Sequence, residues 1–170
     1  GCPPWRGRTH HWSASRAMSP VLRLKLPPTF DEPAGLSHAD GKLYVADTNN
    51  HAIRVLDLNA GTVATIAGTG NMGRSVIPAG IEALAVNLRS PWDVALGGDT
   101  TLYIAMAGTH QIWAMDLMAN TLSPAVGNGR EAMLNDSLLN SELAQPSGLY
   151  VVGDQVYFAD SESSTIRVDK

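Results

Sequence analysis

The side chains best suited to acid–base or metal chemistry recur at matching points of a repeated pattern. Asp47 and His51 follow one apolar run, His110 follows a second, and Asp160 ends a third. Carboxylates and imidazoles are common metal ligands and general acids or bases. One interpretation of these residues is therefore a metal or catalytic site.

The alternative is a structural role in the turns that join neighbouring strands. Met106 replaces the aspartate in the second copy of the pattern, and Ser164 replaces the histidine in the third, so the pattern tolerates the loss of each group. An aspartate at a strand end accepts hydrogen bonds from the turn that follows it. Blade-equivalent histidines should also lie well apart. We therefore predict no metal and no cofactor, and a structural turn role for Asp47, His51, His110 and Asp160.

The pattern itself is an internal repeat of short strands. Apolar runs with a central tyrosine end in a polar turn, which an alternating apolar–polar run follows; the tyrosines are Tyr44, Tyr103 and Tyr157. Such runs predict antiparallel strands, and their spacing is near the ~50 residues of a propeller blade such as kelch. The sequence predicts an all-β fold of four-stranded antiparallel blades, with the last one incomplete. The blades are predicted at about 30–68, 88–127 and 144–170.

The motifs resemble a known family. Pro-x-Gly-Leu near Pro33, Leu-Tyr-Val-Ala-Asp-Thr-x-Asn-His-x-Ile-Arg from Leu43, and x-Val-x-Thr-x-Ala-Gly from Thr62 are similar to the NHL repeat. Longer strings from Arg89 and from Ala144 resemble the NHL segment of thioredoxin-like/NHL proteins. The resemblance covers about residues 30–169 and implies about three blades of a six-bladed propeller. It also implies a non-catalytic recognition or scaffold module, associated with a thioredoxin-like domain that this chain does not contain.

The sequence offers little support for catalysis. It lacks a Ser-His-Asp spacing, a Walker loop, GxGxxG and HExxH, and Cys2 is the single cysteine. An alternative is a metal-dependent propeller enzyme of the lyase or lactonase type. Such a site needs several inward-facing His, Asp or Glu residues, and the starts of the repeats provide only Glu32 and Asp93. A non-enzymatic chain is therefore favoured.

Four residues are candidates for a partner-binding site. Trp92 follows the proline that begins the second repeat, near the expected central channel, and two polar residues share that end of the blades. A second tryptophan occupies a position where the other repeats have arginine. For both tryptophans, packing within or between blades is the alternative, because aromatic side chains bury large areas. The candidates are Trp92, Asp93, Trp113 and Ser147.

Charge distribution separates the first 30 residues from the rest. Residues 1–30 carry a net charge of +5, and residues 31–170 carry −9. An acidic surface repels phosphate, so nucleic-acid binding by the repeats, including an RNA-binding NHL surface, is the less favoured alternative to a protein partner. The leader 1–29 is interpreted as a flexible tail or a truncated edge, or alternatively as a phosphate- or partner-binding arm. Within it, residues 21–26 alternate as a half-buried strand does.

The cellular location follows only from absences. Residues 1–29 contain no signal-peptide core, no apolar run reaches the ~20 residues of a membrane helix, and Cys2 has no partner. We expect a soluble chain without a membrane role, with the cytoplasm favoured.

An open set of blades should expose apolar surface. Fewer than three complete blades cannot close a ring, and bare strand edges promote association. The expected bare residues are Val45, Ile53 and Val55 in the first repeat, and Val156, Phe158 and Ile166 in the last. We predict that the chain self-associates through open blade edges or is a fragment of a longer propeller.

Overall fold

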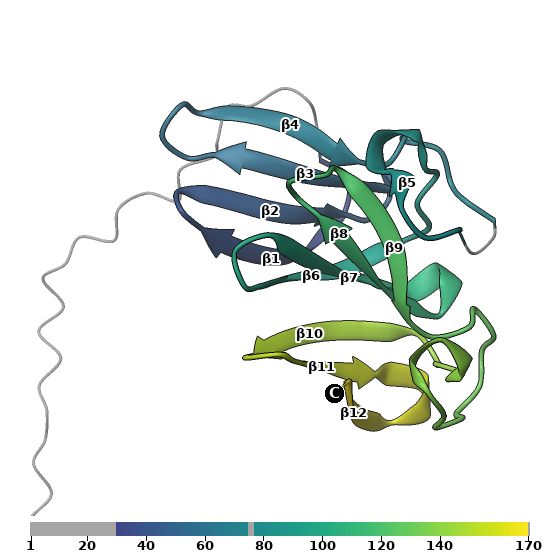
Figure 1. Cartoon of the computed structure of the whole chain (residues 1–170). Coiled ribbons are helices and arrows are strands. Elements are labelled where there is room, and N and C mark those ends of the chain that lie inside the picture. Colours follow the sequence, from purple (N-terminus) through teal and green to yellow (C-terminus); the bar gives the residue numbers. More distant parts are fainter. Residues whose placement is uncertain (1–29, 75–76, 170) are drawn as a thin grey trace, which may run out of the picture.

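The computed structural model describes residues 30–74 and 77–169, and the predicted strand at 21–26 lies outside them. Among the described residues 54% are in strands and 9% are helical, all of the latter in short 3₁₀ turns. The all-β prediction is confirmed. In the described part of the chain twelve strands form three antiparallel sheets, which follow one another along the sequence (Figure 1).

The first sheet contains four strands in the order of the sequence: β1 (Pro33–Ala39), β2 (Lys42–Asp47), β3 (Ala52–Asp57) and β4 (Thr62–Ala67). Asp40 and Gly41, with φ of 48° and 72°, form the two-residue turn between β1 and β2. Two left-handed residues match the twist of paired strands, which makes Asp-Gly a favoured hairpin turn.

The second sheet has one strand more than predicted. β6 (Pro91–Gly97), β7 (Thr101–Met106), β8 (Gln111–Asp116) and β9 (Thr121–Val126) repeat the first sheet, and β5 (Ile81–Glu82) pairs with the outer edge of β9. The linker between blades one and two thus supplies a short outer strand. A 3₁₀ turn, η1 (Ala83–Ala85), follows it. The linker caps the free edge of β9, which protects it from unwanted pairing.

The third sheet contains β10 (Pro146–Val152), β11 (Gln155–Asp160) and β12 (Thr165–Asp169). It is the incomplete blade that the sequence predicted. Three further 3₁₀ turns complete the described elements: η2 (Ala107–Thr109), η3 (Leu138–Asn140) and η4 (Ser161–Ser163).

The three sheets share their irregularities as well as their strands. Pro33, Pro91 and Pro146 each begin the first strand and pair with the last residue of the second, and the register shifts just after each proline. The residue before each proline has a positive φ although none is glycine: Glu32 (46°), Ser90 (49°) and Gln145 (57°). Strained backbone often marks functional sites. Here it recurs in every blade, so it belongs to the architecture.

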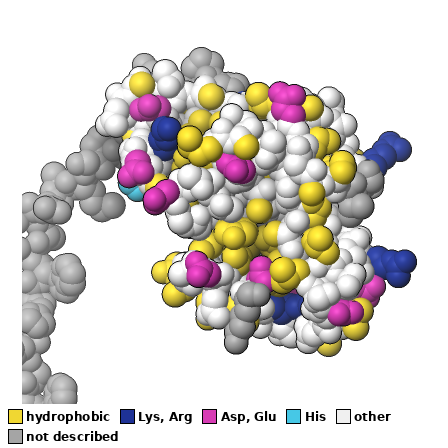
Figure 2. All heavy atoms as spheres, in the orientation of Figure 1, with side chains coloured by type: hydrophobic (Ala, Val, Ile, Leu, Met, Phe, Trp, Pro, Cys, Tyr) yellow, Lys and Arg dark blue, Asp and Glu magenta, His cyan; other side chains and the backbone are white. Residues whose placement is uncertain are grey.

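Each sheet packs one face on the sheet that follows it. Ile53 and Ile112 occupy the same position in blades one and two and are fully buried, whereas Ile166 in blade three is 75% exposed. Ile53 and Ile112 each pack against the blade that follows, whereas no described blade follows Ile166. In Figure 2 hydrophobic side chains line the hollow between the second sheet and the third.

Exposure of the predicted bare faces differs from the expectation at several positions. Ile53 packs with Val55 against the second blade, and Phe158 packs against the second blade from the other side. Val45 and Val156 are also buried. The prediction treated the two faces of each strand as equivalent, although side chains alternate between the faces. Of the six residues predicted to be bare, only Ile166 is exposed on the outward face. That face also carries Tyr150, Val152 and Val168, which are exposed.

The first strands of the blades meet closely at the centre. A Cβ added to Gly35 of β1 would lie 2.4 Å from the Cα of Asp93 in β6, whereas one added to the equivalent Gly148 of β10 would meet nothing closer than 3.9 Å. A glycine is therefore required at position 35, because the backbones of β1 and β6 are in contact there. A backbone atom cannot move aside for an added Cβ as the end of a flexible side chain can.

This difference predicts opposite outcomes for two matched substitutions. Gly35→Ala should lower the free energy of unfolding by about 1–3 kcal/mol, as overpacking does, whereas Gly148→Ala should change it by less than about 0.5 kcal/mol. Urea denaturation of the full chain measures both. Equal effects at the two glycines would show that blades one and two do not approach as described.

Candidate recognition site at the ends of the first strands

A cavity of about 530 Å³ opens where the first strands of the three blades begin. We call it the mouth. β6 packs against both β1 and β10, so all three blades contribute to the mouth (Figure 1). Its lining residues are Glu32, Pro33, Ala34, Thr48, Trp92 and Ser147.

Trp92 is the largest side chain of the mouth and is only partly buried. It follows Pro91 at the point where the register of β6 shifts, and this irregularity places it at the strand end rather than within the sheet. Ser147 lies at the equivalent position of β10. An aromatic surface beside hydroxyl and carboxylate groups is typical of ligand pockets, in which few polar groups orient a mostly apolar contact.

Asp93 lies next to Trp92 but serves the contact between blades. Its Oδ2 accepts a hydrogen bond of 2.7 Å from the Leu149 amide of β10, and its Oδ1 accepts one of 2.8 Å from Val94. Partial burial raises the pKa of the Asp93 carboxyl, and these two amide donors oppose the rise. The carboxylate lines a second, smaller cavity beside β10 and β11 rather than the mouth.

Trp113 has a different role from the other three candidates. It is fully buried in the core between blades one and two, and its Nε1 donates a 2.9 Å hydrogen bond to Gln111. Gln111 in turn donates to the Gly127 carbonyl. The packing alternative accounts for this tryptophan, and the structure brings only Trp92 and Ser147 together at the mouth.

The two predicted turn aspartates are completely buried and paired with arginine. Arg54 approaches Asp47 to 2.9 Å in blade one, and Arg167 approaches Asp160 to 3.0 Å in blade three. The aspartates also accept hydrogen bonds from Asp31 N (2.9 Å) and Ala144 N (2.7 Å), which lead into the same blade. A buried carboxylate needs such a partner set. Each pair therefore fastens the end of its second strand to the start of its blade.

Blade two replaces this charged pair as a unit. Met106 and Trp113 occupy the positions of the aspartate and the arginine, and both are fully buried in the apolar core. Apolar residues can substitute for a buried ion pair without loss of stability, provided that both charges go together. The presence of Met106 in the sequence thus reflects a paired exchange with Trp113.

The two histidines connect one blade to the segment that leads into the next. Ser90 N donates to His51 Nδ1 at 3.2 Å, and His110 Nε2 lies 3.7 Å from a Glu131 carboxylate oxygen. Both histidines have a left-handed backbone, with φ of 47° and 53°. Within the described residues no cluster of three or more His, Cys, Asp or Glu side chains is suited to a metal.

Sequence reasoning did not single out Thr48 as part of the site. It follows β2, and its Oγ1 donates a 2.8 Å hydrogen bond to the Pro91 carbonyl of the next blade. This bond fixes the start of β6 and therefore the base of Trp92. No local signal in the sequence identifies it, because the two residues are 43 positions apart.

Comparison with known proteins shows what these blades are similar to. The sequence pattern of the NHL repeat matches residues 30–56. NHL repeat-containing protein 2 from Homo sapiens is 39% identical over 163 residues, which cover 82% of this chain and 22% of the human protein. Within this chain, the match to the NHL repeat lies in the first blade. Protein SUPPRESSOR OF QUENCHING 1, chloroplastic, from Arabidopsis thaliana is 43% identical over 144 residues, covering 81% of this chain and 14% of that protein. The chain therefore spans less than a quarter of the length of either relative.

Solved structures share the fold of these NHL blades. A structural genomics protein of unknown function from Bacteroides thetaiotaomicron aligns over 85% of this chain and 37% of its own, with a TM-score of 0.70 at 16% identity. An auxiliary nutrient binding protein from the same organism aligns over 78% and 36%, with a TM-score of 0.64 at 15% identity. At such identities the likeness concerns the architecture alone. None of the helices within residues 30–74 and 77–169 has the length and apolar character needed to span a bilayer.

The paired Asp–Arg exchange predicts strong coupling between the two residues. Arg54→Met should cost about 3–5 kcal/mol of unfolding free energy, because it leaves the buried Asp47 carboxylate without its cation. The double variant Asp47→Asn/Arg54→Met should cost clearly less than the two single losses combined. A double-mutant cycle by denaturation measures this coupling. If the losses of unfolding free energy in the two single variants simply added up in the double variant, Asp47 and Arg54 would not act as a pair.

The raised pKa of Asp93 predicts a pH dependence with a definite sign. A carboxyl whose folded pKa exceeds its unfolded value near 3.8 stabilises the fold below that value, and this contribution is lost as pH rises through the folded pKa. The stability of the wild type relative to Asp93→Asn should thus fall as the pH rises from below the ordinary pKa of 3.8 to neutrality, as urea denaturation over that range would show. A relative stability that instead rises over this range would mean that the amide donors outweigh burial.

Proposed function

We propose that this chain is a non-catalytic recognition module whose NHL blades bind a protein partner at the mouth. The observation that carries the proposal is the position of Trp92: a partly buried indole at the convergence of three blades, in a cavity of about 530 Å³. A tryptophan anchored at its base by the Thr48–Pro91 bond contributes a large contact area with little loss of side-chain freedom. Such residues are typical binding hot spots.

The chemistry of the mouth favours a peptide segment over a nucleic acid. Among the residues that the structure describes, its polar groups are a carboxylate, Glu32, and the hydroxyls of Thr48 and Ser147, and its lining includes no lysine or arginine. A phosphate backbone would meet no compensating charge there. A partner with an apolar or aromatic side chain for Trp92, flanked by a basic residue for Glu32, fits the lining.

The same lining gives no support to a metal-dependent propeller enzyme. Such chemistry needs several inward-facing His, Asp or Glu residues, and among the described residues that line the mouth Glu32 is the one acid. The resemblance to thioredoxin-like/NHL proteins adds a redox setting to this proposal. In that setting the mouth would hold a partner near a redox domain and would not itself carry out redox chemistry.

Selection of peptides from a display library on the full chain tests this proposal. Enriched peptides should carry an aromatic or large apolar residue beside a basic one, and Trp92→Ala should weaken their binding at least about tenfold, as loss of a hot spot does. Tyr150→Ala is the matched control, since Tyr150 is an aromatic residue 70% exposed on the outward face of blade three. Peptides that bind the Trp92→Ala variant as well as the wild type would overturn the proposal.

A further inference from the structure

A polar cavity of about 240 Å³ lies where the turn between β7 and β8 meets the segments that precede and follow blade two. We call it the arginine cavity. Its lining includes Arg74 and Arg89 from the preceding segment, His110 from the turn, and Glu131 from the following segment. None of these residues lines the mouth, so the arginine cavity is independent of the proposed partner site.

The fold holds the two arginines of this cavity side by side. Gly73 N donates a 2.7 Å hydrogen bond to the Leu88 carbonyl oxygen, and Arg74 and Arg89 are the residues that follow these two. Neither arginine forms an ion pair with a carboxylate of the residues that the structure describes. Like charges that the backbone keeps close together repel each other, and a concave surface concentrates their potential. An anion between them would relieve this repulsion.

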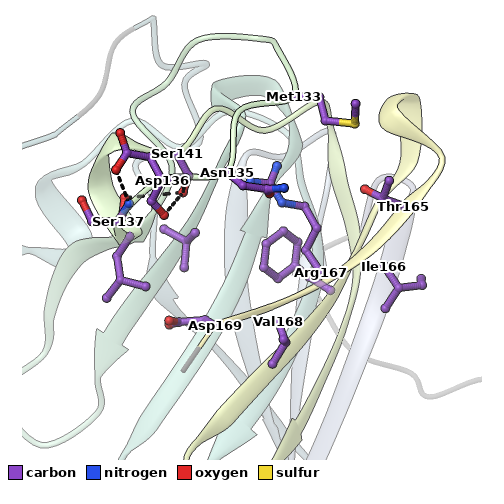
Figure 3. Close-up of a pocket in the computed structure, with 13 residues that line it drawn as sticks. Met133, Asn135, Asp136, Ser137, Ser141, Thr165, Ile166, Arg167, Val168 and Asp169 are labelled. Carbon is purple, nitrogen blue, oxygen red and sulfur yellow. Dashed lines mark hydrogen bonds between the residues drawn. The ribbon is translucent and has the colours of Figure 1, made fainter.

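The remaining arginines of residues 30–74 and 77–169 already have acidic partners. Arg54, Arg130 and Arg167 each lie within 3.9 Å of a carboxylate oxygen. A larger cavity of about 750 Å³ beside β12 shows the contrast (Figure 3). Arg167 is the one arginine among its described lining residues, and that guanidinium pairs with Asp160 at 3.0 Å. Within the described chain, arginines without an acidic partner are thus found at the arginine cavity alone.

The sequence of blade two differs from that of its neighbours at this place. Arg89 lies two residues before the first proline of its blade, where blades one and three have Asp31 and Ala144. Opposite Arg89 the turn carries Gly108, where the other blades have asparagine and glutamate. A Cβ added to Gly108 would lie 2.5 Å from Arg89 Cγ and 2.9 Å from the Arg89 carbonyl oxygen. The glycine thus leaves room for the stem of an arginine that the blade architecture does not itself require.

His110 adds unused hydrogen-bonding capacity to the lining. In blade one, Nδ1 of the equivalent His51 accepts a hydrogen bond from Ser90 N at 3.2 Å. His110 Nδ1 is buried and has no hydrogen-bond partner among the described residues. The turn of blade two therefore does not engage its histidine as the turn of blade one does.

Glu131 opposes an anion in this cavity and limits which anion fits. Its carboxylate lies 3.7 Å from His110 Nε2 and shares a hydrogen bond with Glu162, which raises the pKa of the Glu162 carboxyl. Two arginines against this one carboxylate still leave the described lining with an excess of positive charge. A ligand with more than one negative charge gains more from the two arginines than it loses to Glu131.

We propose that the arginine cavity binds a phosphate group between Arg74 and Arg89. A guanidinium presents a planar fork of donors that fits two phosphate oxygens, and a tetrahedral phosphate has oxygens for two such forks. A phosphate monoester carries a charge of about −1.5 to −2 at pH 7. The cavity of about 240 Å³ admits a single small group. A nucleic-acid strand would extend from it over the acidic repeats, which repel phosphate.

Titration of the ¹⁵N-labelled full chain with inorganic phosphate, followed by NMR, tests the site. The amide signals of Gly108 and Gly129, which line the cavity, should shift and saturate. Arg89→Gln should weaken phosphate binding at least about tenfold, because it removes one of the two forks. Arg130→Gln is the matched control: it removes the same charge from an exposed arginine outside the lining and should change the affinity less than about twofold.

Further titrations separate this site from other basic and binding surfaces. Glu131→Gln should tighten phosphate binding, because it removes a negative charge from the lining, and acetate should bind more weakly than phosphate. Trp92→Ala should leave the phosphate affinity unchanged, which keeps a failure at the mouth distinct from a failure here. Shifts confined to residues 1–29, or equal affinities of the wild type and Arg89→Gln, would each overturn the proposal. Weaker binding in Glu131→Gln, or tighter binding of acetate than of phosphate, would do so as well.

Discussion

The packing of one sheet's forward face on the next sheet is the contact on which this structure depends. Ile53, Ile112 and Ile166 have the same place in their blades, and only those with a following blade are buried. Burial of an isoleucine contributes about 1.5–3 kcal/mol, so most of the stabilisation of a blade comes from its neighbours. Repeat proteins share this dependence, since each unit contacts only adjacent units. The mouth exists because this packing brings three strand ends together.

Polar contacts within and between blades then fix the relative positions of the strands. Asp47 and Asp160 each tie a strand end to the start of its blade, whereas in blade two Met106 and Trp113 occupy the equivalent positions within an apolar core. Across blades, Asp93 reaches Leu149 and Thr48 reaches Pro91. The backbone on either side of Trp92 is therefore held in place by hydrogen bonds to blades one and three.

The sequence predicted the all-β fold and the repeated strands, because period-two alternation and turn residues act locally. It did not predict β5, since two residues that pair with a strand some 40 positions away carry no pattern of their own. The sequence also did not predict that Trp113 is buried in the core whereas Trp92 lines the mouth. Both are tryptophans in strands, and only the packing of whole sheets decides which is buried. The exposed face of blade three was misassigned in part for the same reason.

Hydrogen exchange of the strand amides tests the packing most directly. β7 and β11 are equivalent second strands, each bonded on both edges, but β7 has a blade on both faces and β11 on one. Exchange tracks the free energy of local opening, so the amides of β7 should exchange clearly more slowly than those of β11 when the full chain is kept dilute enough to be monomeric. Equal protection of the two strands would contradict packing between blades as the main source of stability.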